Sequence, residues 1–143
     1  MNLRTVATLV LLAAALALNL HSLLPYAAQT GQDFDAIHLY TPLARRWLAE
    51  GWPFLLAQES LQAPPFSWLY PALFGADITS IKIANVVLSC LLLAAVFRAA
   101  MLCHSLAAGI LAAFAFALSP LLRPFLGTAN TEPVFLFLMG VWF

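Results

Sequence analysis

Residues 6–24 read VATLVLLAAALALNLHSLL and contain no charged side chain. About 20 consecutive apolar residues are enough for a helix to cross the roughly 30 Å hydrocarbon core of a bilayer. Backbone inside a bilayer must satisfy its own hydrogen bonds, so such a segment is expected to be helical. The stretch therefore predicts a first membrane-spanning helix. A cleaved signal peptide would also follow an early Arg4, but residues 25–28 (PYAA) are a poor cleavage site and the apolar run is long for a signal.

Composition supports a membrane protein. Of 143 residues, 64% are hydrophobic and 8% are charged, whereas about 25% are charged in a soluble domain. Six basic and six acidic side chains cancel, and the sequence has no polybasic patch of the kind that would indicate a nucleic-acid partner. Cys90 and Cys103 lie in apolar surroundings without CxxC spacing, and we expect both to be small buried apolar side chains rather than a disulfide or metal ligands.

Three further apolar stretches follow. Residues 78–103 predict a second span, with Lys82 and Arg98 near its ends, where their long stems can snorkel to the interfaces. A turn at His104 and Ser105 leads into an expected third span over 106–122. Residues 133–143 start a fourth helix at Pro133, and because a span needs about 20 residues, this one is expected to be incomplete.

The loop 29–77 differs from the spans. It holds five of the six acidic residues and three of the four tryptophans, a mixture typical of a membrane surface. Apolar residues recur at helical spacing before Gly51, a suitable C-cap, and Pro42 either kinks this helix or starts it with Thr41 as cap. A second short helix is expected after Pro64 and Pro65. The apolar positions of the first helix are Ile37, Tyr40, Leu43, Ala44, Trp47 and Leu48.

The sequence thus predicts an all-α, multi-pass transmembrane protein. We expect about four spans, the last truncated, with interfacial amphipathic helices in the first loop outside the membrane. Residues 1–143 then form the N-terminal part of one domain, inactive as this fragment alone because later spans would complete its pockets. Taken literally, the positive-inside rule favours a cytoplasmic loop, since Arg45 and Arg46 lie in it.

Acids and cations gather where the first loop meets the membrane. A carboxylate at this boundary can act as general base towards a hydroxyl, and nearby cations can hold a phosphate leaving group. Simpler roles remain open, because Asp33 or Asp35 could cap a helix and the arginines could be a solvated face. No phosphate-binding glycine loop, serine elbow or HExxH motif is present. The candidate residues are Asp33, Asp35, His38, Tyr40, Arg45, Arg46 and, at the opening of the fourth span, Glu132.

The order of these features resembles membrane glycosyltransferases of the GT-C type, close to glycosyltransferase family 39 and the protein mannosyltransferases. The resemblance lies in residues 35–51 (DAIHLYTPLARRWLAEG), 63–69 (APPFSWL), 73–75 (LFG) with 81–83 (IKI), and 131–132 (TE). These motifs span nearly the whole chain, and their order carries more weight than any one of them.

The resemblance implies a first loop on the non-cytoplasmic side of a bacterial inner membrane. It also implies a polyprenyl-phosphate-linked sugar donor and inverting transfer to a hydroxyl of an acceptor glycan, lipid or protein in the cell envelope. Asp35, seven positions before Pro42, matches the family's catalytic base, while Asp33 is the alternative base. His38, Tyr40, Arg45, Arg46 and Glu132 would bind substrate, and no cofactor is expected. The chain departs from the pattern in the order of His38 and Tyr40, and in Ala63, where the family has a lysine.

Two other functions fit the same pattern. A non-catalytic membrane protein, such as a transporter or channel subunit, would need ionisable groups or broken helices at mid-membrane depth. In the second span only Asn85 and Ser89 are polar at that depth. A membrane-anchored scaffold with an interfacial platform is the third possibility.

Overall fold

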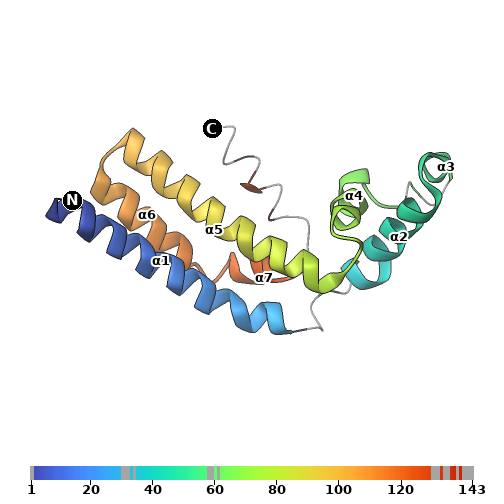
Figure 1. Cartoon of the computed structure of the whole chain (residues 1–143), viewed down its shortest axis with the longest axis horizontal. Coiled ribbons are helices and arrows are strands. Elements are labelled where there is room, and N and C mark those ends of the chain that lie inside the picture. The colour runs from blue at the N-terminus through green and yellow to red at the C-terminus, as the bar shows by residue number, and fades with distance from the viewer. Residues whose placement is uncertain are drawn as a thin grey trace.

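The computed structural model describes residues 2–29, 33, 35–57, 60, 62–129 and the single positions 133, 136, 137 and 139. All regular structure in these residues is helical. Helices α1 (Leu3–Ala28), α5 (Ile78–Cys103) and α6 (Leu106–Leu118) pack side by side, and α7 (Arg123–Gly127) lies against one end of the bundle. The first-loop helices extend beyond that same end, past the last turn of α1 and the first turn of α5 (Figure 1). The predicted all-α architecture is confirmed for the described residues.

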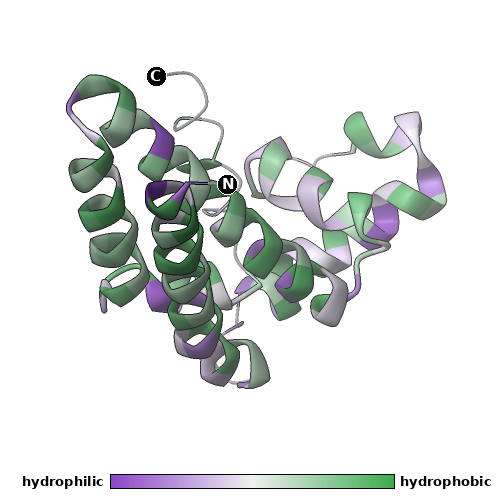
Figure 2. Ribbon diagram, turned by 60° about the vertical axis from the view of Figure 1, so that its left-hand side comes forward, coloured by the Kyte–Doolittle hydropathy of each residue, from purple (hydrophilic) through white to green (hydrophobic). Residues whose placement is uncertain are grey.

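Two helices, α1 and α5, are long and apolar enough to cross a membrane. Only 17% of the most apolar stretch of each is buried within the chain, whereas a core helix of a soluble protein is mostly buried. Hydrophobic residues follow both helices along the visible sides of the bundle, and hydrophilic residues are concentrated in the first loop and near helix ends (Figure 2). Their surface is therefore suited to lipid.

The starts of the two long helices are set by side-chain caps. Asn2 accepts a hydrogen bond from the Thr5 N–H at 2.8 Å, so α1 begins before residue 6. Asp77 accepts one from the Ser80 N–H at 2.7 Å and starts α5 at the predicted residue. This hydrogen bond, with a smaller contribution from the Arg45 charge, lowers the pKa of Asp77.

The expected third span is wrong in its length. Helix α6 ends at Leu118 after 13 residues, short of the roughly 20 that a span needs. Ser119 adopts an extended conformation because the following Pro120 disfavours helical backbone at the residue before it. The chain then turns into α7. Of the expected fourth span, most residues lie outside those described, although Pro133, Leu136, Phe137 and Met139 are helical.

Small residues bring the bundle helices close together. The core of α1, α5 and α6 contains Ala15, Leu93, Ala113 and Ala117, and small side chains at helix interfaces allow close backbone approach in membranes. Asn19 of α1 donates a hydrogen bond to Ser89 Oγ of α5 at 3.0 Å. Cys90 is half-buried, but Cys103 is exposed at the end of α5, contrary to the expectation that both are buried.

The first loop folds into its own helical group. A π-helix, η1 (Ala36–Tyr40), runs directly into α2 (Thr41–Glu50), and α3 (Trp52–Leu55) and α4 (Pro65–Leu73) follow. Pro42 would clash with the carbonyl of His38 in a regular α-helix, and the wider π turn lies at this point. Thr41 is therefore inside a continuous helix and is not its cap. Gly51, with φ of 65°, ends α2 as predicted.

Trp68 is the centre of this group. Its side chain is fully buried, with its ring 5.2 Å from that of Phe54 and 5.7 Å from that of Trp47. Helix α2 buries Leu43 and Ala44 against this cluster and exposes Arg45. The loop therefore has a core of its own, which holds its polar residues at the end of the bundle.

Candidate functional site

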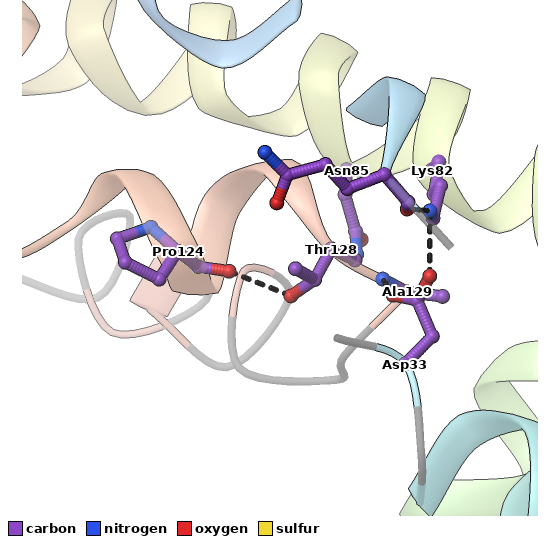
Figure 3. Close-up of polar contacts among 7 residues, drawn as sticks. Asp33, Lys82, Asn85, Pro124, Thr128 and Ala129 are labelled. Carbon is purple, nitrogen blue, oxygen red and sulfur yellow. Dashed lines mark hydrogen bonds and ion pairs between the residues drawn. The ribbon is translucent and has the colours of Figure 1, made fainter. Parts of the chain in front are cut away.

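Asp33 lies in a buried polar junction at the loop end of the bundle. Its Oδ2 is 2.5 Å from Nζ of Lys82 on α5, and its Oδ1 accepts a hydrogen bond from the Ala129 N–H at 2.8 Å. Lys82 also donates to the carbonyl oxygen of Gln29, just after α1. Asp33 is 0% exposed and Lys82 is 6% exposed. Figure 3 shows Lys82 and Asp33 facing each other, with Ala129 beside the carboxylate. We call Gln29, Asp33, Lys82 and Ala129 the buried junction.

The burial of Lys82 corrects the expectation that its side chain snorkels to the interface. The ammonium points into the chain, because Asp33 and the Gln29 carbonyl together replace the water that it loses. A buried charge needs such partners, and removing one member of a buried pair typically costs about 3–5 kcal/mol. The junction therefore joins the end of α1, the first loop, α5 and the chain after α7.

A second polar chain meets the junction at the next residue. Tyr70 of α4 donates its hydroxyl hydrogen to Asn85 Oδ1 at 2.5 Å, and Asn85 Nδ2 donates to the Thr128 carbonyl at 2.6 Å. The Thr128 hydroxyl donates to the Pro124 carbonyl at 2.7 Å. Burial raises the pKa of Tyr70 to about 12. Asp33 directly, and Tyr70 through Asn85, are thus connected to adjacent residues of the segment that follows α7.

Asp35 has a different environment from Asp33. It stands at the start of η1, is exposed, and makes no capping hydrogen bond among the described residues. Its carboxylate is therefore open to a ligand approaching from outside. On the following turn His38 is exposed, while Tyr40 is half-buried against the loop core. The structure places both candidate acids at the loop end of the bundle, one enclosed and one accessible.

The two arginines of α2 also differ. Arg46 contacts both carboxylate oxygens of Glu50, at 2.8 and 3.2 Å, and its guanidinium lies 5.4 Å from the centre of the Phe54 ring. The hydrogen bond from Arg46 lowers the pKa of Glu50. Arg45 is exposed and close enough to lower the pKa of Asp77. Arg46 is therefore engaged in the loop fold, whereas Arg45 faces outward above the start of α5.

Glu132 lies outside the described residues. Ala129, three positions earlier, is bonded to Asp33 in the junction. In the described parts of the chain, no group of three or more His, Cys, Asp and Glu side chains could hold a metal ion.

An apolar hollow of about 390 Å³ opens between α1 and α5 beside the junction. Lys82 lies at its wall, and the other lining side chains are mostly aliphatic. Because both helices have surfaces suited to lipid, an acyl or prenyl chain could enter the hollow from a bilayer. The lining residues are Leu24, Ala27, Ala28, Ile78, Thr79, Lys82, Ile83, Val86 and Val87.

Lys82, Asn85 and Tyr70 were not among the residues that the sequence marked as candidates. The sequence does point to Lys82 and Asn85, since a lysine and an asparagine inside an apolar span need a partner. The partners could not be identified, because they lie 49 and 43 positions away along the chain, at Asp33 and Thr128. Tyr70 had no such signal in an aromatic-rich loop.

The chain matches no protein-family model, no curated protein and no solved structure. The resemblance to membrane glycosyltransferases therefore rests on the motifs of this chain alone.

Proposed function

We propose that this chain belongs to a multi-pass membrane glycosyltransferase. In this proposal it transfers a sugar from a polyprenyl-phosphate donor to an acceptor hydroxyl at the non-cytoplasmic face of a bacterial inner membrane. One observation carries the proposal. An accessible carboxylate, Asp35, lies two residues from a buried junction that borders an apolar hollow between two lipid-compatible helices. A lipid-linked substrate needs an accessible polar site for its sugar next to an apolar site for its lipid chain.

The reaction follows from the donor chemistry. The acceptor oxygen attacks the anomeric carbon of the sugar, and the bond from that carbon to the phosphate oxygen breaks. The hydroxyl proton passes to the Asp35 carboxylate, and polyprenyl phosphate leaves with the bonding electrons. Attack from the face opposite the phosphate inverts the anomeric centre. A positioned general base of this kind typically contributes about 10²–10⁴-fold in rate.

The charged side chains at the loop end of the bundle support a division of labour. Lys82 is already neutralised by Asp33 in the buried junction, so it is a poor choice for the leaving phosphate. Arg45 is exposed and is the cation of α2 that we assign to the phosphate. His38, also exposed, Tyr40 and the predicted Glu132 complete the proposed substrate contacts, and Arg46 supports α2.

The transporter alternative has less support. Three polar side chains inside the two long helices, Asn19, Asn85 and Ser89, are buried and bonded to one another or to neighbouring segments. Groups engaged in helix packing do not line a path for a solute.

The proposal is tested by a transfer assay on the natural protein in membranes, with a panel of radiolabelled polyprenyl-phosphate sugars. We expect label to move from the lipid to an envelope acceptor. D35N should reduce kcat by about 10²–10⁴-fold with little change in donor binding, because the amide keeps the carboxylate shape.

E50Q is the matched control, because Glu50 is another carboxylate of the same loop paired only on the surface. It should retain near-normal turnover. A nearly active D35N protein would contradict the assignment of the base. Absence of transfer from every donor by folded protein, alongside an active reference transferase, would contradict the function.

A further inference from the structure

Both oxygens of the Asp33 carboxylate are already occupied inside the chain. Lys82 holds Oδ2 and the Ala129 N–H is bonded to Oδ1, while the side chain is 0% exposed. A general base must come within about 2.6–3.2 Å of the hydroxyl that it deprotonates. An acceptor approaching from outside reaches Asp35 but not Asp33.

We infer that Asp33 is a positioning residue, which places the helix start bearing Asp35 relative to α5 and to the chain after α7. The part of this inference that concerns catalysis rests on the proposed function. The connection from Asp33 to Asp35 is through the backbone. The Asp33 carbonyl accepts a hydrogen bond from the Ile37 N–H at 2.8 Å, and so opens the first turn in which Asp35 lies.

The other side of the junction is equally well fixed. Lys82 is four residues beyond the start of α5 and contacts the Gln29 carbonyl at the end of α1. Ala129 is held in a buried cluster with Ala36, Tyr70 and Ile81. The carboxylate of Asp33 thus fixes the position of the first loop relative to α1, α5 and the segment that follows α7. A misplacement of about 1 Å in a catalytic group can cost on the order of 10²-fold in rate.

The buried pair allows a charge-removal test. D33N leaves the Lys82 ammonium without its counter-charge, and K82M leaves the Asp33 carboxylate without its counter-charge. The double variant D33N/K82M removes both charges and fills the volume of the lysine stem. Its introduced amide oxygen still provides an acceptor for the Ala129 N–H. A positional role therefore predicts that the double variant recovers the amide protection and the turnover that each single variant loses.

The first readout is amide hydrogen exchange of the natural protein in nanodiscs, followed at Ala129 and across η1. In D33N and K82M, exchange at these amides should be about 10–100-fold faster, because each leaves one buried charge without its counter-charge and so destabilises the junction around them. In D33N/K82M it should return to within about threefold of the starting rate. E50Q, which removes an exposed loop carboxylate, should leave these rates unchanged.

The second readout is turnover with the polyprenyl-phosphate donor, separated into kcat and KM. D33N should lower kcat about tenfold with little change in KM, and D33N/K82M should recover most of it. A double variant with restored exchange but the low kcat of D33N would overturn the inference, since the carboxylate itself would then take part in the chemistry. Unchanged exchange in D33N would overturn it as well.

The exchange pattern separates this inference from the proposed function. If the unmodified protein transfers no sugar, the proposed function fails, and the exchange rates still decide whether Asp33 positions the loop. If D33N does not accumulate as folded protein, recovery of folded D33N/K82M supports the positioning role. Equal loss of both variants contradicts it.

Discussion

The Tyr70 hydroxyl lies 2.5 Å from Asn85 Oδ1, although Tyr70 belongs to the first loop and Asn85 to the long helix α5. The same asparagine donates to the Thr128 carbonyl after α7. One side chain therefore connects three segments, and its amide is fully buried. Inside a protein such a chain of hydrogen bonds is costly to break, because each abandoned group loses water as well as its partner.

The first prediction concerns this contact. Y70F removes a buried hydroxyl that bonds Asn85, and we expect the free energy of unfolding to fall by about 1–3 kcal/mol. N85A should cost more, because it abandons both the Tyr70 hydroxyl and the Thr128 carbonyl. Denaturant unfolding in detergent micelles measures both. The control is Y26F, which removes a phenol hydroxyl from half-buried Tyr26 on α1. Equal stability of Y70F and Y26F would contradict the prediction.

The second prediction follows from the pKa of Tyr70, which burial raises from 10.0 to about 12. The neutral phenol is the form that the fold favours, so the unfolded chain loses this proton at lower pH than the folded chain. The stabilisation is complete below pH 10 and decreases as the pH rises through about 12. We expect unfolding to become easier across this range, and less steeply so in Y70F. An identical alkaline slope in wild type and Y70F would argue against it.

The helix ends show what the sequence can predict. Helix α5 begins at residue 78 and ends at residue 103 as predicted, because Asp77 is a local cap and the apolar run is continuous. The end of α6 was missed, although its cause, Pro120, is also local. Leu121 and Leu122 are apolar and favour a longer span, but proline restricts the backbone of Ser119 and ends the helix.

The site was less predictable than the helices. Asp33 and Asp35 are both acids of the same loop, and only tertiary contacts distinguish them. Asp33 is enclosed because Lys82, 49 residues later, and Ala129, 96 residues later, converge on it. No spacing rule brings those positions together. The local role of Arg46 could have been found, since Glu50 follows it by one helical turn and such pairs interact.

The third prediction concerns the contact between α5 and α6. A Cβ on Gly109 would lie 2.8 Å from the Phe97 carbonyl oxygen and 3.0 Å from Met101 Cβ. G109A should therefore force the helices apart and lower stability by about 1–3 kcal/mol, despite the better helix propensity of alanine. A107L adds bulk two residues earlier, at an exposed position, and should be tolerated. A G109A protein as stable as wild type would show that the two helices are not in close contact.

The last prediction separates the two arginines of α2. Arg46 holds Glu50 in an exposed pair of little energetic weight and lies over Phe54, and the contact with the ring is worth about 0.5–1 kcal/mol. R46A should therefore lower stability by about 1 kcal/mol and leave KM for the donor nearly unchanged. R45A removes the exposed cation that we assign to the phosphate. It should raise KM about tenfold or more, because a charge-assisted hydrogen bond is worth about 1.5–3 kcal/mol, with little loss of stability.

E50Q removes the carboxylate partner of Arg46 without changing either arginine. It should reproduce only the smaller part of the R46A stability loss, since the guanidinium remains over Phe54. Thermal unfolding and donor saturation curves on the same four proteins give both quantities. If R46A raises KM while R45A lowers only stability, the roles are reversed and the phosphate lies on the Glu50 side of α2. If neither variant changes KM, the donor phosphate is not bound by this helix, because removing a cation that contacts a dianionic or monoanionic phosphate must weaken its binding.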